Sequence, residues 1–156
     1  MISNNVTRML EARKTRFQAF EVPVEKLSAL EVADILQIPP EDVYKTIVAK
    51  RAKPGKPILA VVPGSLEVDT KKLAAALGEK KVFITSLNEA EAMTGLLAGG
   101  ISPLALINKG FQVLIDASSQ KKETILVSAG QRGLQVRLSP ADLAKLCNAR
   151  FADIAG

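Results

Sequence analysis

Apolar segments of strand length outnumber helical segments along this chain, and the two kinds do not alternate strictly. The strand-like segments are the later part of 41–50, then 58–63, 81–85, 111–116, 123–130 and 133–138, preceded by 17–22. The helical segments are 4–14, 28–38, 70–78, 89–95 and 139–147. A parallel doubly wound sheet needs regular strand–helix alternation, so this order favours one mixed sheet, curved or partly barrel-like, surrounded by helices. We expect a single α/β domain over residues 1–156.

Local patterns refine this expectation. A Lys-Pro-Gly-Lys turn at 53–56 separates two apolar strands and predicts a hairpin at the centre of the sheet. Ser28 and Glu31 have the spacing of a capping box, and Asn88 is predicted to cap the helix at 89–95. The apolar side of the helix at 28–38 is predicted to comprise Leu30, Ala33, Ile35 and Leu36.

The 156 residues include no histidine, which excludes several kinds of active site. Ser-His-Asp and Cys-His catalysis and the common zinc sites all require this residue. The single cysteine, Cys147, lies at a position typical of the apolar side of a short C-terminal helix, although a catalytic thiol is the alternative. Any chemistry must therefore depend on lysine, hydroxyls, carboxylates, backbone amides or the substrate itself. We expect neither a metal nor a cofactor.

The formal net charge of +5 fits a polyanionic partner such as nucleic acid. With 4% aromatic residues and no tryptophan, an extended stacking platform for single strands is not expected. No apolar run approaches the roughly 18–20 residues that span a bilayer, and the N-terminus lacks the pattern of a secretory signal. We expect a cytoplasmic protein with neither a membrane nor DNA as a partner. The exposed lysines are assigned no role: Lys80, Lys81, Lys121 and Lys122.

Three segments depart from the pattern of a plain core. Lys45 lies inside the apolar stretch "VYKTIVA", either with its ammonium at the strand's end in water or as a cation that faces a cleft. Gly99 and Gly100 interrupt the apolar run 95–110, either as an ordinary turn or as amide donors for an anion or carbonyl oxygen, with Ser102 adding a hydroxyl. Gly99, Gly100 and Pro103 exclude a continuous helix there.

The third segment is "SAGQRGLQ", residues 128–135. A strand ends at Ser128, and Arg132 lies between two glycines. The arginine is either a solvated charge or a planar group suited to phosphate.

These three segments together resemble a known family. "VYKTIVA", "GGISPL" and "VSAGQRGLQVRLSPADLAKL" are similar to the YbaK/EbsC-type aminoacyl-tRNA deacylases, over nearly the whole chain. The resemblance implies a mixed α/β fold and hydrolysis of mischarged aminoacyl-tRNA, with Cys-tRNA(Pro) as the substrate. It also implies the aminoacylated 3′ end of tRNA as a partner, and prolyl-tRNA synthetase as a further one.

The resemblance also implies roles for single residues. Lys45 is the residue tied to deacylation, and Gly99 and Gly100 hold the ester end. Ser102 and Ser128 lie at the substrate pocket, and Arg132 is implied in contact with tRNA. The cysteine thiol of the substrate, or the 2′-hydroxyl of its terminal adenosine, assists cleavage, so the family needs neither a metal nor a protein nucleophile.

The chain departs from the family in two places. Ala105 replaces a glycine in "GGISPLA", and the segment "FEVPVEKLSA", which forms part of the pocket wall in relatives, is short and lacks a tyrosine. The alternative function is therefore a catalytically silent module that binds tRNA or a synthetase. A small-molecule hydrolase is a weaker alternative, because no pair of nucleophile and base is visible.

Overall fold

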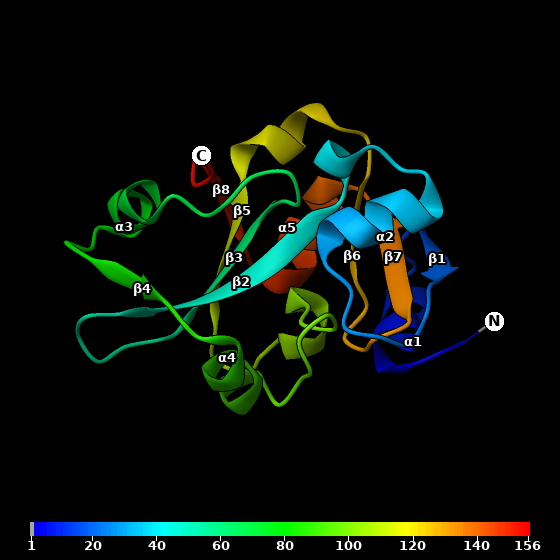
Figure 1. Cartoon of the computed structure of the whole chain (residues 1–156), viewed down its shortest axis with the longest axis horizontal. Helices are drawn as coiled ribbons and strands as arrows, with labels where there is room; N and C mark the ends of the chain where they lie inside the picture. Colours follow the sequence, from blue (N-terminus) through cyan, green and yellow to red (C-terminus); the bar gives the residue numbers. More distant parts are fainter. Residues whose placement is uncertain (1) are drawn as a thin grey trace.

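The computed structural model describes residues 2–156, and its strands form two sheets (Figure 1). The three-stranded sheet is antiparallel in the order β1-β7-β6, with β1 Phe17–Glu21, β6 Ile125–Ser128 and β7 Leu134–Leu138. The five-stranded sheet has the order β4-β2-β3-β5-β8, with β2 Tyr44–Arg51, β3 Ile58–Pro63, β4 Val82–Ile84, β5 Gln112–Asp116 and β8 Arg150–Ala152. It is mixed, because β2 pairs antiparallel with β3 and β4, whereas β5 pairs parallel with β3 and β8.

The predicted α/β class and the central hairpin are confirmed, but the partly barrel-like single sheet is wrong. Within residues 2–156 neither sheet closes, and the backbones of the two sheets pair only at an isolated parallel bridge between Val43 and Leu126. Val43 follows Pro39, Pro40 and a 3-10 turn, η1, at Pro40–Asp42. The Asp42 and Val43 amides donate to the Pro39 and Pro40 carbonyls within this turn, and the prolines themselves have no amide hydrogen, so strand pairing does not extend back past Val43.

In the described part of the chain, five short α-helices flank the sheets, and 3-10 turns complete the fold (Figure 1). The helices are α1 Asn5–Ala12, α2 Ala29–Leu36, α3 Thr70–Leu77, α4 Leu87–Thr94 and α5 Pro140–Cys147. The two further 3-10 turns are η2 Pro103–Leu106 and η3 Ala117–Lys121. None of the helices within residues 2–156 is long and apolar enough to cross a membrane.

The structure tests the predicted caps of α2 and α4 and the predicted apolar side of α2. The capping box of Ser28 and Glu31 is present at α2. The predicted cap Asn88 is wrong: α4 begins one residue after Ser86, whose hydroxyl accepts the Glu89 amide. Leu30 and Ile35 were expected on the buried side of α2, yet they are 51% and 45% exposed.

Ala33 is buried as predicted, and Leu36 packs partly buried against the same cluster, whereas Val32 takes the place expected for Leu30 and Ile35. Val32 and Ala33 pack near Val43 and Leu126. Only this narrow side is covered, because α2 is eight residues long and lies over the junction of the two sheets. The other end of the molecule has a separate core, in which α3 packs on the completely buried strand β3. The start of α2 is therefore left beside an open space between the sheets.

Candidate functional site

A cavity of about 480 Å³ lies where the two sheets meet. Its walls come from the start of α2, the first half of β2, one residue each of β6 and β7, and the loop after α4. The lining includes Lys26–Val32, Val43–Ile47, Glu67, Ala98, Gly99, Ile101, Ser128 and Gln135. The volume falls within the range of roughly 300–1,000 Å³ for small-molecule sites. The end of the short segment "FEVPVEKLSA", residues 26–29, thus forms part of the pocket wall.

Lys45 reaches this cavity from the inner strand β2. Its ammonium Nζ lies 3.1 Å from Oε1 of Glu67, which also lines the cavity. The Lys45 side chain is 22% exposed, whereas that of Glu67 is 82% exposed. The ammonium is therefore held at the cavity by a partner that is itself largely in water.

The glycine pair lies in a tight turn formed by Leu97–Gly100. The Gly100 amide donates to the Leu97 carbonyl over 2.8 Å, and Gly99 has a φ of +90°. A positive φ at the third residue of such a turn is typical of type II and favours glycine. Gly99 also needs the space, because a Cβ there would lie 3.3 Å from both the Leu27 nitrogen and the Lys26 Cα.

The two glycines differ in their position relative to the cavity. Gly99 lines it, while Gly100 is buried, with its amide engaged in the turn. A Cβ on Gly100 would lie 2.8 Å from the backbone of Gln131, so close packing requires this glycine. Of the two amides, that of Gly99 belongs to a residue lining the cavity and has no acceptor among the described residues.

The predicted polar residues also separate into two groups. Ser128 lines the cavity, and its hydroxyl accepts the Gly130 amide over 3.3 Å. Ser102 is completely buried outside the lining, and its hydroxyl accepts the Leu104 amide at the start of η2. Arg132 also lies outside the lining, and its Nε donates to the Ala98 carbonyl over 2.7 Å.

Gln135 lines the cavity but was not among the predicted residues. It lies directly opposite Ser128 in the β6–β7 register and is only 5% exposed. Within residues 2–156, no completely inaccessible side-chain nitrogen or oxygen lacks a partner. No hydrogen bond ties the Gln135 amide to another described residue, so its polar atoms keep access to the cavity. The strand pattern "LQVRL" gave no signal, because alternation puts Gln135 on the same face as the solvent-facing Arg137.

Two other sequence features have local structural explanations. Cys147 ends α5, and burial raises its pKa to about 12, so its thiol stays protonated. Ala105 lies in η2 with its Cβ against Gly130: a Cβ on Gly130, which has a φ of +91°, would be 2.7 Å away. Ala105 therefore fits because residue 130 is glycine.

The lysines that were assigned no role are not all alike. Lys122 donates to Asp42 over 2.6 Å, and this bond raises its pKa. Lys81 lies over the ring of Phe83, with Nζ 5.3 Å from the ring centre. Neither residue lines the cavity. Among the described residues, no three acidic, cysteine or histidine side chains are grouped to hold a metal ion.

Comparison with known proteins adds to this geometry. Residues 24–146 match the aminoacyl-tRNA editing domain. The chain is 40% identical over 152 residues to EbsC of Enterococcus faecalis, a proposed Cys-tRNA(Pro)/Cys-tRNA(Cys) deacylase, with 96% of this chain and 92% of that protein covered. It is also 31% identical over 88 residues to the uncharacterized YwhH of Bacillus subtilis, covering 56% of this chain and 55% of that protein.

Solved structures share the fold. The hypothetical protein APE2540 has a TM-score of 0.87 at 20% identity, with 98% of this chain and 100% of that chain covered. A proposed trans-editing enzyme for prolyl-tRNA synthetase has a TM-score of 0.80 at 22% identity, with 100% and 99% covered. On the match to the domain and the similarity to EbsC over almost its full length, the chain belongs to the aminoacyl-tRNA editing domain family.

Proposed function

We propose that this protein is a trans-acting deacylase that hydrolyses the ester of mischarged aminoacyl-tRNA, with Cys-tRNA(Pro) as its substrate. One observation carries the proposal: Lys45 and Gly99 line the same cavity. A cation and a main-chain donor on one cavity suit a substrate that joins an anionic nucleic acid to an ester carbonyl. The relative EbsC, described as a proposed deacylase of Cys-tRNA(Pro), supports the same substrate class.

In this proposal, Lys45 binds the phosphate or ribose end of the terminal nucleotide. The Gly99 amide donates to the ester carbonyl, and Ser128 and Gln135 face the aminoacyl group. The exposed Leu30 and Leu87 at the same cavity provide an apolar surface for the terminal base. Bases stack readily on apolar and aromatic surfaces, and this contact would be tolerant of sequence.

The reaction adds water across the ester. The acyl C–O bond breaks, a hydroxyl group joins the acyl carbon, and the ribose oxygen leaves with a proton. The substrate's 2′-hydroxyl or thiol assists, so that the protein supplies orientation and stabilisation of charge. Aligned internal groups lower a barrier by roughly 7–11 kcal/mol in favourable cases. A donor facing the oxyanion contributes about 3–4 kcal/mol more.

A silent binding module is the second candidate, and the Lys45–Glu67 ion pair favours it. An ammonium that stays paired with Glu67 would not reach the substrate. The pair is exposed on the Glu67 side, and exposed ion pairs contribute only about 0–1 kcal/mol to stability. An incoming phosphate can therefore displace Glu67, and we retain the deacylase as the proposed function. We propose that residues 1–156 act as one domain, with prolyl-tRNA synthetase as a further partner.

A deacylation assay with mischarged tRNAs tests the function. Purified protein is mixed with Cys-tRNA(Pro), Ala-tRNA(Pro) and Ser-tRNA(Pro), and loss of the labelled amino acid is followed against correctly charged Pro-tRNA(Pro). We expect fast loss from Cys-tRNA(Pro) and none from Pro-tRNA(Pro). Binding without cleavage of any member would favour the silent module instead. Binding should also weaken as salt is added, since phosphate contacts release counterions.

A further inference from the structure

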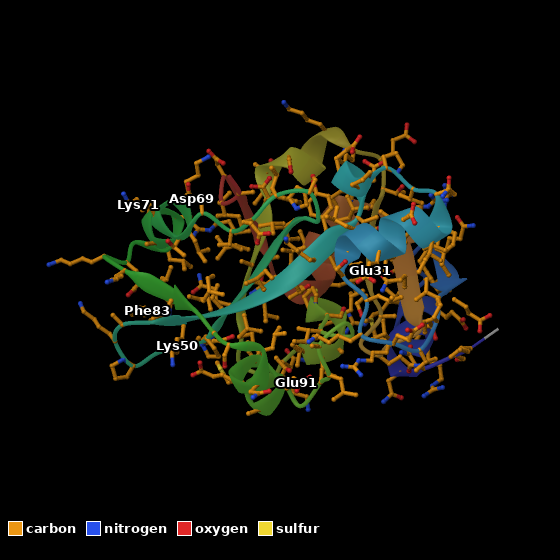
Figure 2. All side chains as sticks on the ribbon, in the orientation of Figure 1. Glu31, Lys50, Asp69, Lys71, Phe83 and Glu91 are labelled. Atoms are coloured by element: carbon orange, nitrogen blue, oxygen red, sulfur yellow. The ribbon has the colours of Figure 1, made fainter. Side chains whose placement is uncertain are left out.

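Side chains from two distant parts of the chain hold the backbone on both sides of Ala98. The carboxylate Oε2 of Glu91 accepts the Ala98 amide over 2.7 Å. The guanidinium Nε of Arg132 donates to the Ala98 carbonyl, also over 2.7 Å. Glu91 lies on α4 (Figure 2), and Arg132 lies in the turn between β6 and β7. Both bonds involve charged side chains, which makes them roughly twice as strong as neutral ones.

The Ala98 carbonyl and the Gly99 amide belong to one peptide group. This group is trans, as no cis peptide is present within residues 2–156, so the carbonyl and the N–H point in opposite directions. The carbonyl points to Arg132, which does not line the cavity, while Ala98 and Gly99 do line it. Among the described residues, no acceptor takes the Gly99 amide hydrogen. Fixing the Ala98 carbonyl therefore also fixes the direction of the Gly99 N–H, which is free to donate to a ligand.

A turn of this kind has an alternative. Rotating the central peptide group converts a type II turn to type I, with little movement of the flanking Cα atoms, and reverses its N–H. In such a flip the Ala98 carbonyl would lose its charged bond to Arg132. A buried carbonyl left without a hydrogen-bond partner is destabilising, because it has lost its hydration without replacement. Ala98 is itself 5% exposed, so water would not readily replace Arg132.

We propose that Arg132 and Glu91 are positioning residues that lock the Ala98–Gly99 peptide group, so that the Gly99 amide faces the bound ester carbonyl. This inference rests on the proposed function. It gives Arg132 a role different from the contact with tRNA that the sequence resemblance implied. Charged donation to the carbonyl also polarises the peptide group, which makes the Gly99 N–H a better donor.

Three variants and two controls separate this inference from its alternatives. Glu91→Ala removes the acceptor of the Ala98 amide, whereas Glu91→Gln keeps an oxygen in its place. Arg132→Ala removes the donor to the Ala98 carbonyl. The matched control for Glu91 is Glu89→Ala, because Glu89 lies on the same helix and bonds only Lys50 through its carboxylate, over 2.5 Å.

A second matched control serves Arg132. Arg137→Ala changes an arginine on β7, the strand that follows the Arg132 turn, and this arginine donates to Gln18 away from the loop. Each variant is measured as the full chain by single-turnover deacylation of Cys-tRNA(Pro), by the protein concentration giving half the maximal rate, and by thermal unfolding. The ¹H–¹⁵N signal and the hydrogen exchange of the Gly99 amide are recorded without substrate.

We expect Glu91→Ala and Arg132→Ala to lower the maximal single-turnover rate at least about tenfold, since small misplacements of reacting groups cost rates of this size or more. The half-saturating concentration should change less than twofold. Glu91→Gln should retain most of the rate, and both controls should match the parent protein. The Gly99 amide signal should shift and exchange faster in the two alanine variants alone.

Full maximal rates in both alanine variants would overturn the inference. So would an Arg132→Ala protein with an unchanged maximal rate, a higher half-saturating concentration and a salt slope lower by about 1, because that result indicates a phosphate contact. If the parent protein cleaves no mischarged tRNA, the proposed function fails. The ¹H–¹⁵N signal of the Gly99 amide then decides by itself whether Arg132 and Glu91 fix the peptide group. An unchanged signal in both alanine variants then overturns the lock, and a shifted signal supports it.

Discussion

Lys45 on β2 and Gly99 in the Leu97–Gly100 turn line the same cavity, although they come from distant parts of the chain. β2 belongs to the five-stranded sheet, and the turn follows α4, at the lower edge of the molecule in Figure 1. The turn is held against the backbone of residues 26 and 27, immediately before α2. The cavity therefore depends on three segments that meet only in the folded chain.

Replacing Gly99 tests the need for this turn. Gly99→Ala should destabilise the fold by roughly 1–3 kcal/mol, the cost of a left-handed backbone in a residue with a side chain. It should also lower deacylation more than the loss of folded protein explains, because the new Cβ presses on Leu27. Gly78→Ala is the control: its φ is +69°, nothing lies within 4 Å of the added Cβ, and it is outside the cavity. Equal activities of the two variants per folded molecule would contradict the prediction.

Neutralising Glu67 tests the competition for Lys45. In Glu67→Gln the ammonium loses a charged partner 3.1 Å away and becomes free for an anionic ligand. We expect the half-saturating tRNA concentration to fall about twofold to fivefold, in keeping with about 0–1 kcal/mol for an exposed ion pair. Asp153→Asn is the control, since Asp153 is similarly exposed and pairs with Lys72 outside the cavity. Weaker binding by Glu67→Gln would show that Glu67 itself assists the substrate.

A substitution of Gln135 tests whether this residue recognises the aminoacyl group of the substrate. Gln135→Leu keeps the approximate volume and removes the amide beside Ser128. Sites that hydrogen-bond a substrate discriminate strongly against analogues that lack the group. We expect the ratio of rates on Cys-tRNA(Pro) and Ala-tRNA(Pro) to change at least about fivefold, as even small pocket differences change rates 10–200-fold. Gln18→Leu, an exposed glutamine on β1, should leave the ratio unchanged. The same ratio in both variants would remove Gln135 from the site.

Cys147 predicts a pH dependence of stability. Burial raises the pKa of the folded thiol to about 12, from an ordinary value of 9.0. Between these values the unfolded thiol ionises while the folded thiol stays protonated, so the free energy of unfolding should fall as the pH rises from 9 toward 12. Cys147→Ala should show a smaller fall over this range, measured by urea unfolding. Parallel curves would mean that the thiol is not the group responsible.

The sequence predicted the fold where local patterns decide it. The capping box at Ser28 and Glu31 and the hairpin of β2 and β3 depend on neighbouring residues, and both are present. The division into two sheets was missed because it depends on where Val43 and Leu126 stop pairing. The short strand β8 was missed as well, since its three residues, Arg150–Ala152, are too few to show a period.

The site could be predicted only in part, because some of its features depend on contacts between distant segments of the chain. Lys45 was visible from sequence because a charge inside an apolar strand is unusual. Gln135 was not, because only the covering α2 makes that face of β7 part of a cavity. The glycine pair was visible, but the separate roles of Gly99 and Gly100 depend on the turn and on packing against Gln131.

The central claim is that the Lys45 ammonium acts on the substrate in this cavity. The most direct measurement is the single-turnover rate of Lys45→Ala on Cys-tRNA(Pro), beside Lys50→Ala as the control. Lys50 lies on the same strand, pairs with Glu89 and is outside the cavity. We predict that Lys45→Ala retains the parent's thermal unfolding profile yet loses about 100-fold or more in rate, the size of effect seen when one stabilising donor is removed, while Lys50→Ala stays near the parent rate. A Lys45→Ala protein that deacylates at the parent rate would contradict the account.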